Sequence, residues 1–431
     1  MTLSSDPGAA PVRGPAALHL HRWNDRAVVG VAIAAFASGF GQFDVVAALG
    51  DVARGFGQVT HGATLSDQAG LSGTALGIGL AIMRLASLGA LPLTSLADDF
   101  GRRKMLLITV SAGLAMTVLA AASPSYWWFV AIFACGRPLL SATNGLAQVT
   151  AAEQTASADR AKALALIAAG YGTGAGVIAI VHSLASRAIG FRGVFILALI
   201  PLALLPLIGR WVQEPDRFTV AVAGAGHPIP VLDAVARPFR RRLLVIVVLS
   251  FAISVITGPA NSFVFLFAQN FLHQMGIVTA GMVVGAGVAG LAGLLAGRWL
   301  ADRVGRRLTG ALAMVTVALL ATLTYAGPAP ALLAGYILGV FAASVFAPAA
   351  GALVNELFPT SVRASVVGWS VAAGVLGAVT GLVVFGAVAG VHHQFGVAGV
   401  VTFLPAALVM VLFWLLPETR GREPEDLWPE S

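Results

Sequence analysis

The sequence predicts an all-α membrane protein in which twelve transmembrane helices form two halves of six. Of its 431 residues, 58% are apolar and only 10% are charged, whereas soluble domains carry about a quarter charged residues. Long apolar runs recur along almost the whole chain, and short charged motifs repeat at a nearly constant offset. The lipid bilayer is therefore the expected solvent of this chain and one of its partners.

Each bilayer crossing requires about 20 mostly apolar residues. The predicted spans are Ala27–Leu49, Leu71–Leu93, Met105–Ala122, Tyr126–Val149, Ala161–Ala185, Val194–Trp211, Leu243–Phe267, Ile277–Leu300, Leu308–Tyr325, Ala331–Val354, Ala364–Val391 and Gly396–Leu416. Such long continuous runs are typical of helices, because barrel strands are shorter and alternate in polarity.

The basic residues predict the orientation, since Lys and Arg near short loops stay on the cytoplasmic side. They gather at alternate loops, which places both termini in the cytoplasm of an inner (plasma) membrane protein. We expect a cytoplasmic tail at 1–25, a first six-helix bundle at 26–209, a cytoplasmic linker at 210–242, a second bundle at 243–416 and a tail at 417–431.

Three motifs in the first half return in the second. Asp98-Asp99-Phe100-Gly101-Arg102-Arg103 is matched by Asp302-Arg303-Val304-Gly305-Arg306-Arg307, an offset of 302 − 98 = 204. Glu153 through Arg160 is matched by Glu356 through Arg363, and Glu214 by Glu418. Glycine permits the positive φ of a tight turn, and the arginines can pair with carboxylates. A duplicated six-helix unit predicts a transport site between the halves, near the middle of the membrane.

With these motifs the chain resembles the major facilitator superfamily, whose twelve-helix fold the resemblance implies. The pattern Glu356-x-x-Pro359-x-x-x-Arg363, together with Pro-Glu-Thr-Arg-Gly from Pro417, is similar to the sugar-porter branch and its metabolite:proton and aromatic-acid:proton symporter relatives. The resemblance implies secondary active transport.

The repeated motifs at the cytoplasmic loop edges predict ion-pair networks that close the inner gate. The gating residues are Asp98, Gly101, Arg102, Arg103, Glu153, Arg160, Asp302, Gly305, Arg306, Arg307, Glu356 and Arg363.

Three charged residues lie well inside predicted spans, away from the span ends, where such groups are costly and usually functional or paired. Asp44 on the first span and Arg137 on the fourth are assigned to proton coupling; at 1.5 Å per residue, Asp44 lies about 7 Å from the outer end of its span. Gly41-Gln42-Phe43-Asp44 is similar to the Gly-Tyr-Asp of proton-coupled relatives. Arg84 on the second span is assigned to an anionic substrate, with a purely structural role as the alternative.

Asn261, Tyr171 and Trp369 complete the predicted substrate site, although packing roles are the alternative for each of them. The single cysteine, Cys135, excludes an intrachain disulfide. We find no metal-binding pattern, cofactor motif or catalytic pairing, so the chain is expected to be no enzyme, and its basic residues form no nucleic-acid surface.

The sequence therefore predicts a monomeric transporter that takes up a small metabolite, such as an organic acid, together with protons. Two alternatives within transport are proton-driven efflux of a hydrophobic compound and sugar transport. A membrane sensor or scaffold that transports nothing is a further alternative, but it would not need Asp44 and Arg137 in the membrane.

Overall fold

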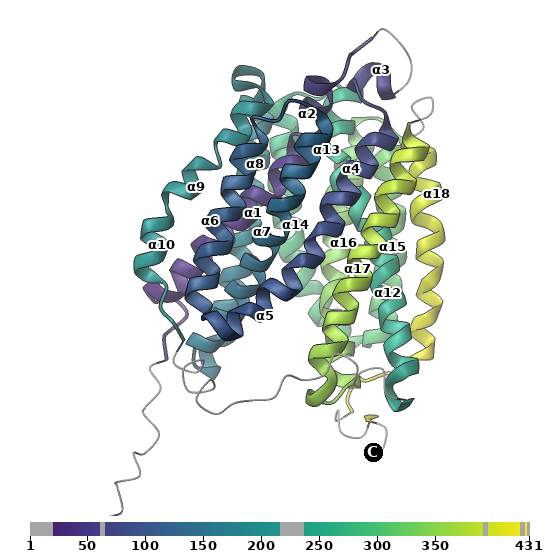
Figure 1. Cartoon of the computed structure of the whole chain (residues 1–431). Helices are drawn as coiled ribbons and strands as arrows, with labels where there is room; N and C mark the ends of the chain where they lie inside the picture. The colour runs from purple at the N-terminus through teal and green to yellow at the C-terminus, as the bar shows by residue number, and fades with distance from the viewer. Residues whose placement is uncertain (1–19, 61–64, 216–236, 391–394, 423–426, 429–431) are drawn as a thin grey trace, which may run out of the picture.

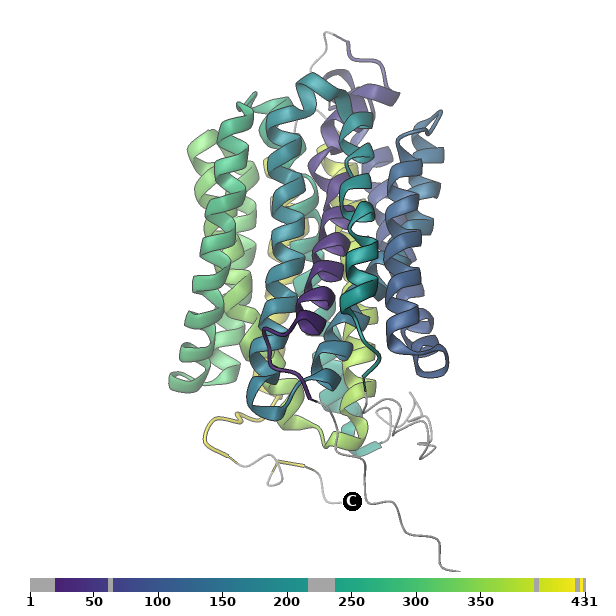
Figure 2. The ribbon, with the colours of Figure 1, turned by 90° about the vertical axis from the view of Figure 1, so that its left-hand side faces the viewer.

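The computed structural model describes residues 20–60, 65–215, 237–390, 395–422 and 427–428. Across these ranges the chain contains twelve helical segments that are long and apolar enough to cross a membrane, and no β-strand. The predicted all-α class with twelve spans is thereby confirmed. The long helices run side by side from one end of the molecule to the other (Figure 2).

The first half, the N-half, contains the elements up to α10 (Figure 1). Its helices are α1 (Arg26–Ala47), α2 (Leu49–Phe56), α3 (Leu65–Ala69), α4 (Gly73–Ala86), the 3₁₀ turn η1 (Ser87–Gly89), α5 (Ala90–Phe100), α6 (Arg102–Ala120), α7 (Tyr126–Gln154), α8 (Ser157–Ile196), α9 (Leu199–Ala203) and α10 (Leu205–Trp211). Two successive spans are joined within α8, where Gly190 adopts φ 68°.

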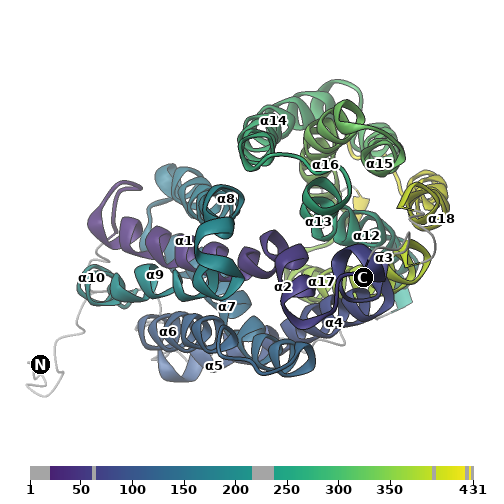
Figure 3. The ribbon, with the colours of Figure 1, turned by 90° about the horizontal axis from the view of Figure 1, so that it is seen from above.

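The second half, the C-half, begins after the linker. Its elements are α12 (Arg237–Ser262), α13 (Val264–Leu266), the π-helical turn η3 (Phe267–Phe271), α14 (Gly276–Arg303), α15 (Arg306–Ala326), α16 (Ala329–Leu357), α17 (Thr360–Ala389), α18 (Phe395–Ala407) and the 3₁₀ segment η4 (Leu408–Leu415). Seen from above, the two halves form separate groups that meet where α4 packs on α17 and α8 packs on α14 (Figure 3).

Several boundaries differ from those predicted. The first span ends at Ala47, two residues before the predicted Leu49, and the short helix α2 follows it to Phe56 after a break at Ala48. Helix α12 begins at Arg237, inside the predicted linker, and residues 216–236 of that linker lie outside the described residues. Charged residues at a helix end extend the helix beyond its apolar core, which the apolar run alone does not reveal.

The molecule has two distinct ends. We call the end that carries the turns before α6 and α15 the basic end, because Arg102, Arg103, Arg306 and Arg307 follow these turns. The opposite end, which carries α2, α3 and the start of α14, is the far end (Figure 1).

Glycines allow α1 and α8 to touch backbone to backbone inside the N-half. A Cβ atom on Gly39 would collide with the carbonyl group of Tyr171, and one on Gly174 with the carbonyl group of Phe36. Close approach through small residues is a usual basis of helix association in membranes, where water supplies no hydrophobic drive between helices. The two helices are therefore expected to move as one body.

We predict that Gly174→Ala lowers the unfolding temperature of the purified protein, because the added methyl group must displace backbone. Overpacking of this kind costs about 1–3 kcal/mol. Gly172→Ala is the matched control, since a Cβ atom there meets no atom within 4 Å. Equal unfolding temperatures for the two variants would show that the α1–α8 contact is not tight.

Candidate functional site: a cavity between the halves

The turns at the basic end have the backbone that the sequence predicts. Gly101 and Gly305 adopt φ 95° and 112°, a region that residues with side chains rarely occupy. Each turn starts a helix whose first amide groups are bound by a carboxylate from the end of the same half. Glu214 accepts hydrogen bonds from the amides of Arg102 and Arg103, and Glu418 does so from those of Arg306 and Arg307. A negative charge is favourable at a helix N-terminus.

Two arginines gather carboxylates beside these turns. Arg102 contacts Asp98 at 2.6 Å and Glu153 at 3.3 Å. Arg306 contacts Asp302 and Glu356, each at 3.2 Å. Each network joins residues of a single half.

The remaining predicted gating residues make other contacts. The side chain of Arg103 donates to the carbonyls of Gly209 and Val212, and that of Arg307 donates to the carbonyl of Trp414. Arg363 donates to the backbone carbonyls of Asn355 and Phe358. The Nε atom of Arg160 is buried without a hydrogen-bond partner. Arg103, Arg307 and Arg363 therefore bind backbone carbonyls at helix ends in this conformation.

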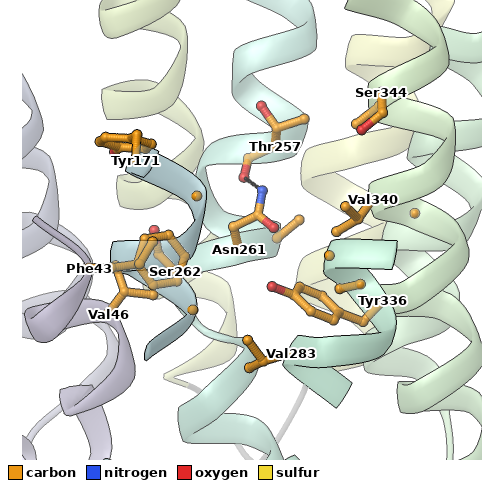
Figure 4. A pocket seen from close by; sticks show the side chains of 18 of the residues that line it. Phe43, Val46, Tyr171, Thr257, Asn261, Ser262, Val283, Tyr336, Val340 and Ser344 are labelled. Carbon is orange, nitrogen blue, oxygen red and sulfur yellow. Dashed lines mark hydrogen bonds between the residues drawn. The ribbon is translucent and has the colours of Figure 1, made fainter. Parts of the chain in front are cut away.

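A cavity of about 1070 Å³ lies between the halves. Its walls come from α1, α4, α7 and α8 on one side and from α12, α14, α15, α16 and α17 on the other. Several of the lining side chains are shown in Figure 4. The halves touch at the far end, where Gly50 contacts Asn270 and Gly276 contacts Ser183. The far end is thus the closed side of the cavity.

The polar lining includes four of the predicted substrate and coupling residues. The polar side chains are Gln42, Arg84, Arg137, Tyr171, Thr173, Ser254, Thr257, Asn261, Ser262, Thr324, Tyr336 and Ser344. Arg84, Arg137 and Tyr171 lie together in the N-half wall, on α4, α7 and α8. No Asp or Glu lines the cavity in the described part of the chain, so its fixed charge is positive.

Trp369 does not line this cavity. It lies on α17 nine residues before Ala378, the first lining residue of that helix, hence about 13 Å nearer the basic end at 1.5 Å per residue. Its place in this conformation gives no support to the predicted substrate contact.

Arg137 is held by the first helix. Its Nη1 atom donates to the carbonyl oxygen of Gln42 at 2.9 Å, while its Nε atom has no hydrogen-bond partner. The Gln42 amide in turn donates to Ser38, whose hydroxyl donates to the carbonyl of Leu140. This network fixes α1 against α7 and holds the arginine at the cavity wall.

Asp44 and Arg137 do not form an ion pair in this conformation. Asp44 is fully buried, and neither of its carboxylate oxygens has a hydrogen-bond partner. Gln42, Phe43, Val45 and Val46 line the cavity, but Asp44 does not. Asp44 follows Gly41 by one helical turn, and the Cβ position of Gly41 faces Leu114 and Leu140 of α6 and α7.

The last turn of α12 positions Asn261. Pro259 lies inside α12 and cannot donate a backbone hydrogen bond. The hydroxyl group of Tyr325 donates to the carbonyls of Pro259 and Ala260 at 3.2 and 2.8 Å. The side-chain amide of Asn261 donates to the carbonyl of Thr257 at 2.9 Å, and the residue faces the cavity (Figure 4).

The sequence analysis missed several residues of the site. The helix-capping role of Glu214 and Glu418 could have been predicted from their offset, which is the same 204 residues as that of the turns. The sequence did not indicate that Tyr336 and Ser344 line the cavity, because a single polar residue in an apolar run does not reveal which side of the helix faces the cavity.

Two six-helix halves around a central, partly polar cavity define a membrane carrier. The sequence profile described as Major Facilitator Superfamily matches residues 31–300 and 273–427. The chain belongs to this superfamily and is a multi-pass membrane protein and a secondary transporter.

Relatives and solved structures agree with this assignment. A putative metabolite transport protein of Haemophilus influenzae is 28% identical over 65% of this chain and 71% of its own length. A probable 4-methylmuconolactone transporter of Cupriavidus pinatubonensis is 25% identical over 83% of this chain and 85% of its own. The inward open structure of the xylose transporter XylE from E. coli superposes with a TM-score of 0.69 at 20% identity, covering 93% of this chain and 99% of that one. The structure of the nucleoside transporter NupG superposes with a TM-score of 0.71 at 18% identity, covering 90% of this chain and 98% of that one. These structures show the shared fold.

Proposed function

We propose that the protein imports a small organic anion together with protons. The observation that carries this proposal is the charge of the cavity wall, which contains Arg84 and Arg137 and no lining carboxylate in the described part of the chain. Two like charges in a membrane-buried cavity are costly unless an anion offsets them. A bound carboxylate can accept paired hydrogen bonds from a guanidinium group.

The opposite wall suggests the rest of the substrate. Val283, Val288 and Leu291 of α14 give it an apolar surface, while Asn261 and Tyr336 provide hydrogen-bonding groups. An anion with an apolar body and a second polar group would fit both walls. The names of the two relatives, a metabolite transporter and a 4-methylmuconolactone transporter, support a small metabolite.

Arg84→Lys should raise the apparent Km for a transported carboxylate about tenfold, equivalent to about 1.4 kcal/mol, and lower the maximal rate less. Lysine keeps the charge but loses the planar fork that binds two carboxylate oxygens. The measurement is uptake into proteoliposomes over a range of substrate concentrations. Arg298→Lys, which alters an exposed arginine of α14 outside the cavity, is the control. An unchanged Km in Arg84→Ala would exclude substrate binding by this residue.

We assign the coupled proton to Asp44. A buried carboxyl group without a partner costs least free energy as the neutral acid, and Asp44 is buried without a partner here. The guanidinium group of Arg137, on α7, binds the carbonyl of Gln42, which lies two residues before Asp44 on α1. A movement of α1 against α7 that brings the guanidinium group to the carboxylate would favour release of the proton.

Asp44→Asn, which mimics the protonated acid, should abolish accumulation of substrate driven by a pH gradient and leave counterflow exchange intact. Both are measured in the same proteoliposomes, with and without the imposed gradient. Asp67→Asn, in the short helix α3 outside the cavity, should behave as the unaltered protein. If Asp44→Asn still concentrates substrate against its gradient, the proton is carried elsewhere or transport is uncoupled from it.

We further propose that the basic end faces the cytoplasm and that its ion-pair networks close the cavity there in the opposite conformation. The excess of arginine at this end supports the orientation. The networks of Arg102 and Arg306 support the gating role, because each is already assembled within its own half and can dock on the other. Single exposed pairs contribute about 0–1 kcal/mol, so the closing effect is collective.

Asp98→Asn should increase access to the cavity from the basic end. We would replace Cys135 by serine, introduce cysteine at the exposed lining residue Ala165, and measure its labelling rate with a membrane-impermeant thiol reagent. We expect the labelling rate to be at least about threefold higher than that of the parent, which corresponds to a change of about 0.7 kcal/mol in the free energy between the closed and open forms. Asp99→Asn changes the neighbouring exposed acid and is the matched control. Equal rates in both variants would exclude the gating role of Asp98.

A further inference from the structure

A buried acid–histidine pair lies at the far end, outside the cavity. The Nε2 atom of His182, on α8, lies 2.9 Å from an Oδ atom of Asp51, on α2. The His182 side chain is completely buried, and that of Asp51 is 27% exposed. Ser186, one turn further along α8, lies close enough to Asp51 to help lower the pKa of its carboxyl group. The pair therefore ties α2, which follows the first span, to the end of the fifth span on α8.

The chain neighbours of this pair make the contacts that close the far end. Gly50 precedes Asp51, and its backbone packs directly on the Asn270 side chain, leaving no room for a Cβ atom. Ser183 follows His182, and its carbonyl packs with equal closeness on Gly276. Residues 270–276 of the C-half, from η3 to the start of α14, are thus in close contact with α2 and α8 of the N-half.

Helix α2 needs a tie to α8 to hold this position. It has only eight residues and is separated from α1 by the break at Ala48. Further contacts with α8 involve aromatic rings, since the rings of Phe56 and Phe191 lie 5.4 Å apart and Arg192 packs on Phe56. The contact between Asp51 and His182 differs from these because Asp51 and His182 are the chain neighbours of Gly50 and Ser183.

We propose that Asp51 and His182 form a latch that holds the far end closed by fixing Gly50 and Ser183 around residues 270–276. Opening of the far end then requires α2 and α8 to separate or to shift together away from this segment. Because the cavity lies behind this contact, the latch sets the fraction of molecules in which the far end is open. The proposal concerns positioning residues, and it rests on the alternating access of the proposed transport cycle.

The electrostatic surroundings set the response to pH. Arg54 of α2 acts on Asp51, Arg192 of α8 packs on the ring of Phe56, and Asp67 of α3 accepts a hydrogen bond from Thr60. The sequences of α13 and η3, which pack against this region, contain no charged residue. Burial alone would raise the pKa of Asp51, but the hydrogen bond with His182, the nearby Ser186 and the charges of His182 and Arg54 lower it overall.

The sign of the pH effect follows from this lowered pKa. The ionised carboxylate favours the closed form that contains the pair, so its contribution is complete above the ordinary aspartate pKa of about 3.9. It is lost as the pH falls through the lowered value. The far end should therefore open progressively in acid below about pH 4, while Asp51 should contribute no change between about pH 5 and 8.

The test measures distances across the far end by electron spin resonance in lipid nanodiscs, without substrate or gradient. Spin labels on cysteines at Ser125, at the start of α7, and Ala326, at the end of α15, report the separation of the halves in a Cys135→Ser background. Asp51→Asn should lower the ratio of closed to open molecules about fivefold or more without a comparable loss of thermal stability. Asp67→Asn should leave the ratio unchanged.

Two further arms decide the case. Exchanging the pair, Asp51→His with His182→Asp, should restore much of the closed population that either single substitution loses. Acidification should open the unaltered protein but not change Asp51→Asn further. An unaltered ratio in Asp51→Asn, or an equal acid response in that variant, would overturn the latch. Because no transport is measured, such a result would leave the proposed import of an anion standing, and failure of proton coupling would leave the latch standing.

Discussion

Polar groups in hydrocarbon must find their partners inside the protein, and the organisation of this chain follows from that requirement. The backbone meets it by forming helices. Near the end of α12, the hydroxyl of Tyr325 binds the carbonyls of Pro259 and Ala260. Arg137 meets it by binding the carbonyl of Gln42. The groups that fail to meet it, the Asp44 carboxylate above all, are for the same reason the strongest candidates for binding a proton or a ligand.

The two halves share their basic ends but not their interiors. Turns, capping carboxylates and arginine networks occur in both, about 204 residues apart, as for Glu214 and Glu418. The positions that match Asp44, Arg84 and Arg137 in the C-half are Val248, Val288 and Phe341. The cavity is therefore charged on one wall, and on the other neutral with hydroxyl and amide groups. Such asymmetry orients a substrate that has one charged end.

Sequence patterns predicted the features that depend on composition and local geometry. The twelve spans follow from apolar runs, and the positive φ of Gly101 and Gly305 follows from the turn motif. Features that depend on helix rotation and packing did not follow. The Asp51–His182 pair was missed because Asp51 lies on the short helix α2, beyond the apolar run of the first span, and because a single histidine in an apolar run gives no sign of its partner. Whether Asp44 contacts Arg137 depends on which face of α1 is turned toward α7, and the sequence does not reveal this rotation.

The contact between α1 and α8 depends on atoms that are absent. At Gly39 and Gly174 the backbone of one helix occupies the space where a side chain of the other would lie. A contact made of side chains can be repaired by a compensating change in its partner, but neither helix has an atom left to remove here. Every substitution at these two positions adds side-chain atoms, and these atoms must displace backbone of the other helix. The close packing of α1 on α8 therefore depends on glycine being kept at both positions.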